Sequence, residues 1–399
     1  MHDSSEFLDA ASTATYVAPV TSSLSRFFLV LGICIFAGCG DPAASSDTSV
    51  VETTADASPD TGDNGDTEVE STDPDAYDED AVARDTVATH DTQADTDDRK
   101  TDTIGPQDTI DDTGTHHDTA EPFDCSAISD GPFSLTPLSG PVASEDLAFD
   151  ADGHLVGADD QAIFRSRYNA SPKVWVPAFT FRAGLRFLPN GHLIVADDTR
   201  GELVRVSPDG VRYPFVTGLS YPNGLAVDLD GWVFFSEHDS SKVWRVHPFT
   251  GERTLVTAQI ANPNGLAFSP DYRTLYIGGF NGDPTVHAVS ISETGMPGRL
   301  YEFASGVGSG WHDGLGVDIC GNVYITDYNE TKVWRVDPDG QNPRVILDGS
   351  LYPNAYIPNL QWGSGIGGWS RTAIYLPDGW AKGVFEVEIG VPGAPLPYP

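Results

Sequence analysis

The sequence has few basic residues, few cysteines and only one long apolar run. Lysine and arginine total 22 against 59 aspartate and glutamate, a formal net charge of −37. Proteins that bind nucleic acid need basic patches to neutralise phosphates, so this balance argues against nucleic acid as a partner. No CxxC spacing occurs among the four cysteines, which argues against a thiolate metal site. No second apolar run follows the one near the N-terminus, so we expect no membrane-spanning helix in the rest of the chain.

The apolar run extends from Arg26 to Gly38 and reads RFFLVLGICIFAG. It is too short to span a bilayer but has the length of a signal-peptide core. It ends at Phe36-Ala37-Gly38-Cys39, which resembles the lipobox of bacterial lipoproteins. That resemblance implies that residues 1–38 are a lipoprotein signal peptide and that Cys39 is acylated, which would anchor the chain to the membrane of the bacterial cell envelope. Ordinary secretion with an incidental cysteine is the alternative.

Residues 39–122 have the composition of a disordered acidic linker. Asp, Thr, Ala, Ser and Gly dominate, as in DTGDNGDTEVE, and large apolar side chains are almost absent. Such a segment cannot bury enough apolar surface to offset the entropy of ordering it. A calcium-binding array would need a DxDxDG spacing that the Asp runs lack, so a solvated tether is the favoured interpretation.

Six segments of the remaining sequence resemble one another. They read SEDLAFDADGHLVGADD, RAGLRFLPNGHLIVADD, PNGLAVDLDGWVFFSEH, PNGLAFSPDYRTLYIGG, HDGLGVDICGNVYITDY and IPNLQWGSGIGGWSRTAIYLPDG. Each predicts a short apolar strand, usually an Asp-Gly or Asn-Gly turn, and an alternating strand, and a third strand such as KVWRV usually follows. A period of about 40–50 residues with three or four strands is typical of β-propeller blades. We therefore expect residues 123–399 to form an all-β, six-bladed β-propeller that folds as a monomer.

Two features are expected to close this ring. The segment PFSLTPL, which starts at Pro132, is predicted to supply the fourth strand of the last blade, whose own strands end near GVFEVEIG. Beyond Cys34 and Cys39, only Cys125 and Cys320 remain, and two cysteines in an oxidising compartment most simply form a disulfide. A free or metal-bound thiol is the other interpretation of this pair.

A candidate metal site follows from the register of the repeat. The positions two residues before the shared leucine are Glu145, Ala183, Asn223, Asn264, Asp313 and Pro358. Because each lies at the start of an innermost strand, the four oxygen-bearing side chains should meet at one mouth of the central channel. Two carboxylates and two amides form an oxygen-only set that suits a divalent cation, with calcium the favoured ion. In the alternative interpretation, Asn-Gly and Asp-Gly simply make turns.

Other polar residues repeat near this mouth. Carboxylates end the second strand of five units, and we expect them to bind loop N–H groups for architectural reasons; they are Asp159, Asp197, Glu237, Asp327 and Asp378. His312 adjoins Asp313 and could bind substrate or shuttle a proton there. Strand alternation turns His312 away from the channel, which favours packing or a hydrogen bond to a loop.

The units PNGLAFSPDYRTLYI and HDGLGVD, with E-x-x-x-F-D at Glu145–Asp150, resemble the gluconolactonase, regucalcin (senescence marker protein) and lactonase family. The resemblance covers about residues 140–390. It implies a six-bladed propeller whose channel holds a divalent metal through one Glu, two Asn and one Asp; the matching positions are Glu145, Asn223, Asn264 and Asp313. Two departures concern the substrate. Tyr221 stands where the family often has an arginine that contacts sugar lactones, and EDLAF replaces the usual E-G-P-x-W.

Such a site would hydrolyse an activated ester. A cation polarises the substrate carbonyl, and Asp313 is the expected acceptor of the proton from the attacking water. Because calcium acidifies water less than zinc does, we expect a lactone or related ester as substrate, with Tyr221 and His312 as candidate substrate-binding residues. One alternative is a non-catalytic, calcium-stabilised propeller that binds a glycan or a protein. Another is a condensing enzyme similar to strictosidine synthase.

Overall fold

The structure, a computed structural model, describes residues 123–179 and 183–398. The predicted signal peptide (1–38), the acylated Cys39 and the predicted linker (39–122) lie outside these residues, so the lipid anchor stays a prediction. Apart from two 3₁₀ turns, η1 (Cys125–Ala127) and η2 (Gly349–Leu351), the regular structure in this part of the chain is all strand. No helix in the described ranges has the length and apolarity needed to cross a membrane.

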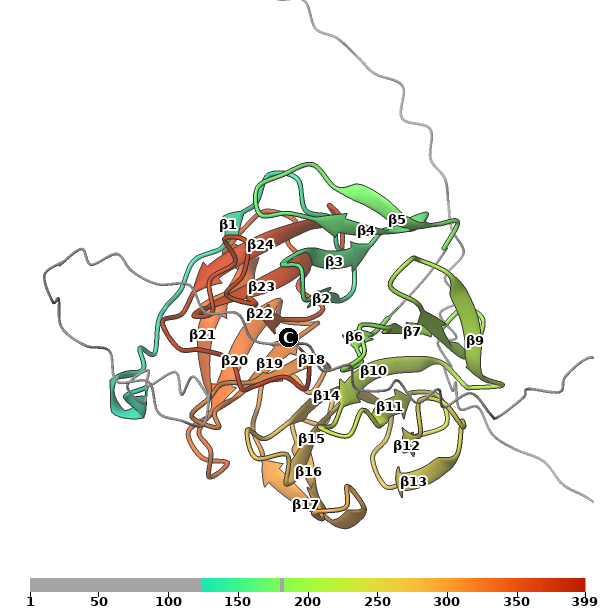
Figure 1. Cartoon of the computed structure of the whole chain (residues 1–399). Helices are drawn as coiled ribbons and strands as arrows, with labels where there is room; N and C mark the ends of the chain where they lie inside the picture. Colours follow the sequence, from blue (N-terminus) through green and yellow to red (C-terminus); the bar gives the residue numbers. More distant parts are fainter. Residues whose placement is uncertain (1–122, 180–182, 399) are drawn as a thin grey trace, which may run out of the picture. The chain divides into compact units, whose positions relative to one another are not determined.

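The described strands form six four-stranded antiparallel sheets arranged around one axis, which confirms the predicted six-bladed propeller (Figure 1). Blade 1 contains β2 (Leu147–Phe149), β3 (Leu155–Ala158), β4 (Ala162–Ser166) and β5 (Lys173–Pro177). Blade 2 contains β6 (Leu185–Phe187), β7 (Leu193–Asp197), β8 (Glu202–Val206) and β9 (Arg212–Thr217). Blade 3 contains β10 (Pro222–Val227), β11 (Val233–Glu237), β12 (Lys242–Val246) and β13 (Arg253–Thr257).

The remaining blades follow the same order from the axis outward. Blade 4 contains β14 (Pro263–Phe268), β15 (Thr274–Gly279), β16 (Val286–Ile291) and β17 (Pro297–Ala304). Blade 5 contains β18 (His312–Val317), β19 (Val323–Asp327), β20 (Lys332–Val336) and β21 (Arg344–Asp348). Blade 6 contains β22 (Gln361–Trp362), β23 (Ala373–Asp378), β24 (Gly383–Glu388) and, as its outermost strand, β1 (Thr136–Pro137).

The ring closes as the sequence predicts. Strand β1, from the N-terminal end of the described chain, pairs antiparallel with β24 from its C-terminal end, with Thr136 opposite Glu386. A disulfide joins Cys125 to Cys320, across a sequence separation of 195 residues. Between these two points Asp130 forms ion pairs with Arg335 and Arg344 on blade 5. The N-terminal segment is thus attached to both of the last two blades.

The second strands are buried along their whole length rather than on one side. Every residue of β7, β11 and β19 is buried. Successive side chains of NVYITD point to opposite faces of the sheet. Because each sheet is covered on both faces, these side chains pack alternately against the preceding and the following blade. One such interface is built from Tyr324, Trp362 and Phe385. Packing between blades supplies the apolar core, and no blade has a core of its own.

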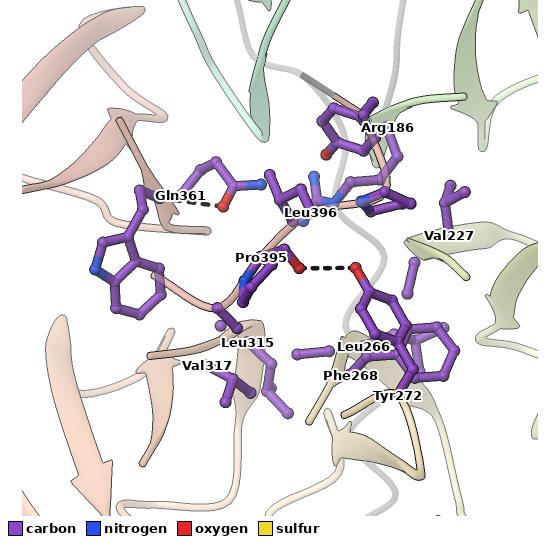
Figure 2. A pocket seen from close by; sticks show the side chains of 17 residues that line it. Arg186, Val227, Leu266, Phe268, Tyr272, Leu315, Val317, Gln361, Pro395 and Leu396 are labelled. Atoms are coloured by element: carbon purple, nitrogen blue, oxygen red, sulfur yellow. Dashed lines mark hydrogen bonds between the residues drawn. The ribbon is translucent and has the colours of Figure 1, made fainter. Parts of the chain in front are cut away.

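The C-terminal segment fills one mouth of the channel, which we call the tail mouth. Residues 394–398 lie among the distal ends of the innermost strands, including Val227, Phe268 and Val317 (Figure 2). The hydroxyl of Tyr272 donates to the carbonyl of Pro395 at 2.8 Å. Tyr398 is 6% exposed and packs on Phe187.

Candidate functional site

The pairs Asn223-Gly224, Asn264-Gly265 and Asp313-Gly314 lie inside strands, so the interpretation that these pairs only make turns is wrong. They occupy β10, β14 and β18, and the pairing register shifts by one residue across each pair. Pro222 lies opposite Glu237, for example, whereas Leu225 lies opposite Phe235. One extra residue on the innermost strand is a β-bulge, a device that re-aims side chains beside functional sites. The bulges occur at Asn223, Asn264 and Asp313.

Hydroxyl side chains satisfy two of the backbone groups that the bulges release. The N–H of Gly224 donates to Ser236 Oγ at 2.8 Å, and the N–H of Gly314 donates to Thr326 Oγ1 at 2.7 Å. Both hydroxyls come from the adjacent second strand and are fully buried. An unpaired buried N–H would be costly, so these residues keep the bulges in place.

The bulges bring neighbouring innermost strands very close together. A Cβ placed on Gly224 would overlap the carbonyl oxygen of Asn264, and one on Gly265 would overlap that of Asp313. Asn223, Asn264 and Asp313 therefore follow one another on adjacent blades, at the mouth where the innermost strands begin. We call this end of the channel the site mouth.

Asp313 is held by two side chains of the channel. Its Oδ1 accepts a hydrogen bond from Asn264 Nδ2 at 3.1 Å, and its Oδ2 accepts one from the hydroxyl of Tyr356 at 3.1 Å. Burial raises the pKa of Asp313 to about 7, although both hydrogen bonds act to lower it.

Glu145 is the second acid of the site mouth. Burial raises its pKa well above the ordinary value, and the charge of Asp313 raises it further. The next residue, Asp146, is satisfied differently, because it accepts from the N–H groups of Leu147 and Leu185 and from the Arg186 guanidinium. Neither Glu145 nor Asp313 forms an ion pair within the described chain, although the charge of Lys382 acts to lower the pKa of Glu145.

The remaining predicted site residues lie around this pair. Asn264 is 4% exposed and contacts Asp313, whereas Asn223 is half-buried on the preceding blade. Tyr221 is 40% exposed, and its hydroxyl bonds to Asp198, whose pKa burial raises to about 6. The charges of Glu145 and Asp313 help to raise the pKa of Tyr221, so its ring lies beside the site.

His312 faces away from the channel. Its side chain is fully buried, and Nε2 lies 2.8 Å from the carbonyl oxygen of Val307. Burial lowers the pKa of His312, which favours the neutral imidazole. This geometry favours the loop-supporting interpretation over contact with substrate.

The second ring of carboxylates binds loops, as predicted. Asp327 accepts from the N–H and hydroxyl of Ser309 and from the N–H of Glu330. Glu237 accepts from the Ser220 N–H and the indole of Trp244. The other three members each accept from one or two N–H groups just beyond their own strand; they are Asp159, Asp197 and Asp378.

A group that sequence reasoning did not single out lies on the turn between β2 and β3. Ligand atoms of Asp150, Asp152 and His154 lie within 4.8 Å of one another, close enough to hold a metal. Asp150 already contacts the ring of His154 and the guanidinium of Arg165, both at 3.1 Å. Those contacts, together with N–H bonds inside the turn, are sufficient to explain the group structurally.

Two residues of the site mouth were also missed from the sequence, for different reasons. Tyr356 lies in the irregular segment before β22, where the repeat offers no equivalent position. Asp198 directly follows the ring carboxylate Asp197, and the doubled acid in VADD was the available signal. At the tail mouth, a cavity of about 60 Å³ remains between the tail and the innermost strands, and one of about 340 Å³ lies beside Trp362 and the tail.

Comparisons with known proteins agree with this architecture. The model of the SMP-30/Gluconolactonase/LRE-like region matches residues 234–349, which include Asn264 and Asp313. A gluconolactonase of Zymomonas mobilis is 26% identical over 200 residues, which cover 42% of this chain and 55% of that protein. A 6-deoxy-6-sulfogluconolactonase of Pseudomonas putida is 32% identical over 149 residues, covering 34% of this chain and 48% of that protein. The chain thus spans about half the length of these curated relatives.

A solved structure supports the fold. A gluconolactonase of Xanthomonas campestris superposes with a TM-score of 0.55 at 23% identity, covering 65% of this chain and 90% of that one. At this identity the likeness shows the six-bladed architecture alone. The family model, the curated relatives and the fold together support the similarity of this propeller to gluconolactonase-like proteins.

Proposed function

We propose that this protein is a metal-dependent hydrolase of lactones or related esters whose active site is the site mouth. The observation that carries the proposal is the pair Glu145 and Asp313, two carboxylates without a direct cationic partner at the open end of the channel. The two curated proteins that the chain resembles are a gluconolactonase and a 6-deoxy-6-sulfogluconolactonase, which supports a lactone as substrate.

The donor set fits a divalent cation, for which calcium is our proposal. Glu145 and Asp313 supply two negative charges, and Asn223 and Asn264 add neutral amide oxygens. Oxygen-only donors suit a hard ion, and two carboxylates match its charge. Burial raises the pKa of both acids, although the charge of Lys382 acts to lower that of Glu145. When bound, the cation would supply Lewis acidity toward the substrate carbonyl.

The chain's own residues would handle the proton. Asn264 and Tyr356 orient the carboxylate of Asp313. Asp313 would accept a proton from the water that attacks the carbonyl carbon, and would return it to the ring oxygen when the carbon–oxygen bond breaks. The products are one hydroxy acid per lactone and per water. Tyr221 is positioned to contact the substrate, because its ring is exposed beside the pair.

The test is hydrolysis of a panel of lactones and aryl esters by the full-length chain. Acid release is measured in the presence of calcium and in the presence of chelator. We expect chelator to abolish turnover and Asp313→Ala to lower kcat/KM at least a hundredfold. Asp159→Ala is the matched control, because that carboxylate serves its own loop at the same mouth; it should keep activity. Turnover that survives both chelator and Asp313→Ala would overturn the proposal. Chelator-sensitive stability without any hydrolysis would favour the non-catalytic, ligand-binding alternative.

A further inference from the structure

Seven aromatic side chains surround the site mouth on blades 3 to 6. All but Tyr356 lie within two residues of the end of a strand at this mouth, and we call the set the aromatic collar. It consists of Tyr221, His238, Phe280, Trp311, Tyr328, Tyr356 and Trp380. The repeat places six of them there, because the start of an innermost strand and the end of its second strand lie side by side, as Pro222 and Glu237 do. Tyr356 enters from the irregular segment before β22.

The rings of the collar contact one another in an unbroken series. Centroid distances are 5.3 Å from Tyr221 to His238 and 6.0 Å from His238 to Phe280. Phe280 lies 5.0 Å from Trp311 and 5.3 Å from Tyr328. The series continues from Tyr328 to Tyr356 at 5.1 Å and from Tyr356 to Trp380 at 5.3 Å. Rings that support one another in this way are already ordered, so a ligand that stacks on them loses little additional side-chain entropy.

The collar is joined to the candidate catalytic residues. The hydroxyl of Tyr356 donates to Asp313, and that of Tyr221 bonds to Asp198. A group bound on the collar would therefore lie next to a carbonyl held at Glu145 and Asp313. Binding energy from such a non-reacting part of a substrate can be used to position the reacting part.

Most of the exposed large aromatic side chains of the described residues belong to the collar. Six large aromatic side chains of the described residues are exposed, and four of them belong to the collar: Tyr221, Trp311, Tyr328 and Trp380. Trp380 is the most exposed, at 67%. Exposed aromatic surface concentrated at one place marks a binding surface.

Three polar atoms of the collar already have partners within the protein. Two are tyrosine hydroxyls, and the third is the imidazole Nδ1 of His238. The collar offers a ligand ring surface, together with the hydroxyl of Tyr328 and the indole N–H groups of Trp311 and Trp380. The carboxylates of Asp198, Asp239 and Asp283 lie on the loops of the same mouth, and their charge would repel an anionic ligand.

We propose that the aromatic collar binds the non-reacting part of the substrate, and that the substrate is a neutral lactone with an aromatic or extended apolar substituent. The identification of the substrate as a lactone rests on the proposed function. The binding of apolar groups by the collar can be tested without turnover.

The test measures binding of γ-lactams, which keep the ring shape of γ-lactones but resist hydrolysis. Calorimetry with the full-length chain compares a methyl, a pentyl, a phenyl and a polyhydroxylated substituent. We expect the phenyl lactam to bind at least tenfold more tightly than the methyl lactam, because the phenyl ring stacks on the collar and buries more apolar surface there. Trp380→Ala should reduce this ratio severalfold.

Phe249→Ala is the matched control. Phe249 is also a highly exposed aromatic residue, at 60%, but it lies beyond the opposite end of β12. It should leave the ratio of phenyl to methyl affinity unchanged. Equal affinities across the series, tighter binding of the polyhydroxylated lactam, or a ratio that Trp380→Ala does not alter would each overturn the proposal. A collar-dependent preference in a chain that hydrolyses none of the matching γ-lactones would uphold the subsite while the proposed hydrolase function fails.

Discussion

Asp313 combines three properties at a single position: it is partly buried, it accepts two hydrogen bonds, and it lies beside a second acid. Asn264 and Tyr356 fix its carboxylate, while the charge of Asp313 helps to raise the pKa of Glu145. A buried pair of like charges is unfavourable unless a proton or a cation neutralises it. The same two residues would therefore make the folded state sensitive to both pH and metal.

The sign of the pH effect follows from the raised pKa values. Without metal, the folded protein retains a proton on Asp313 up to about pH 7, whereas the unfolded chain loses it near pH 4. Between these values the folded state binds more protons, so the contribution of this group to stability falls as the pH rises. In chelator, we expect the melting temperature of the wild type to fall more between pH 5 and pH 8 than that of Asp313→Asn. Parallel melting curves for the two proteins across this range would contradict the assignment, and excess calcium should reduce the difference.

Among the individual site residues, the sequence predicted those that occupy equivalent positions of the repeat. Glu145, Asn223, Asn264 and Asp313 could be found because they share one register. Tyr356 could not, because it approaches Asp313 from an irregular segment with no counterpart in other blades. The repeat pattern shows which positions are equivalent, but it does not predict side chains that enter the site from loops.

Among the strands, the β-bulge is the feature that builds the site. The sequence motif Asn-Gly was compatible with a turn or with a channel position, and periodicity alone could not distinguish them. The structure shows why glycine follows the polar residue: the backbone of the next blade occupies the place of its Cβ. The hydroxyls of Ser236 and Thr326, which support two of the bulges, have no distinctive sequence signal because serine and threonine are common in strands.

A substitution at Gly224 tests this account. Gly224→Ala would push a methyl group into the carbonyl of Asn264, so we expect a loss of about 2–3 kcal/mol in the free energy of unfolding. Gly383→Ala is the control, because Gly383 lies in a strand with no atom within 4 Å of its Cβ position. That change should be neutral or slightly stabilising. Equal effects of the two substitutions in urea unfolding would show that close approach of the blades does not constrain Gly224.

For the molecule as a whole, the ring is closed at the seam and at one mouth. Strand β1 and the Cys125–Cys320 disulfide connect the two ends of the described chain, and both were predicted from the sequence. A crosslink across 195 residues can contribute up to about 5 kcal/mol on the chain-entropy model. The filling of the tail mouth by residues 394–398 was not predicted, because GAPLPYP carries no periodic pattern that would place it in a channel. The two closures leave the site mouth as the candidate entrance for a ligand.

The central claim is that one calcium ion binds at the site mouth of the folded propeller. The most direct measurement is the melting temperature of the full-length chain with calcium and with chelator, for the wild type, Asp313→Ala and Asp159→Ala. Binding only to the folded state stabilises it by about 2.7 kcal/mol when free calcium is a hundredfold above Kd. We predict that calcium raises the melting temperature of the wild type and of Asp159→Ala by a similar amount and has no effect on Asp313→Ala. A wild type that does not respond to chelator, or an Asp313→Ala protein that responds fully to calcium, would contradict the account.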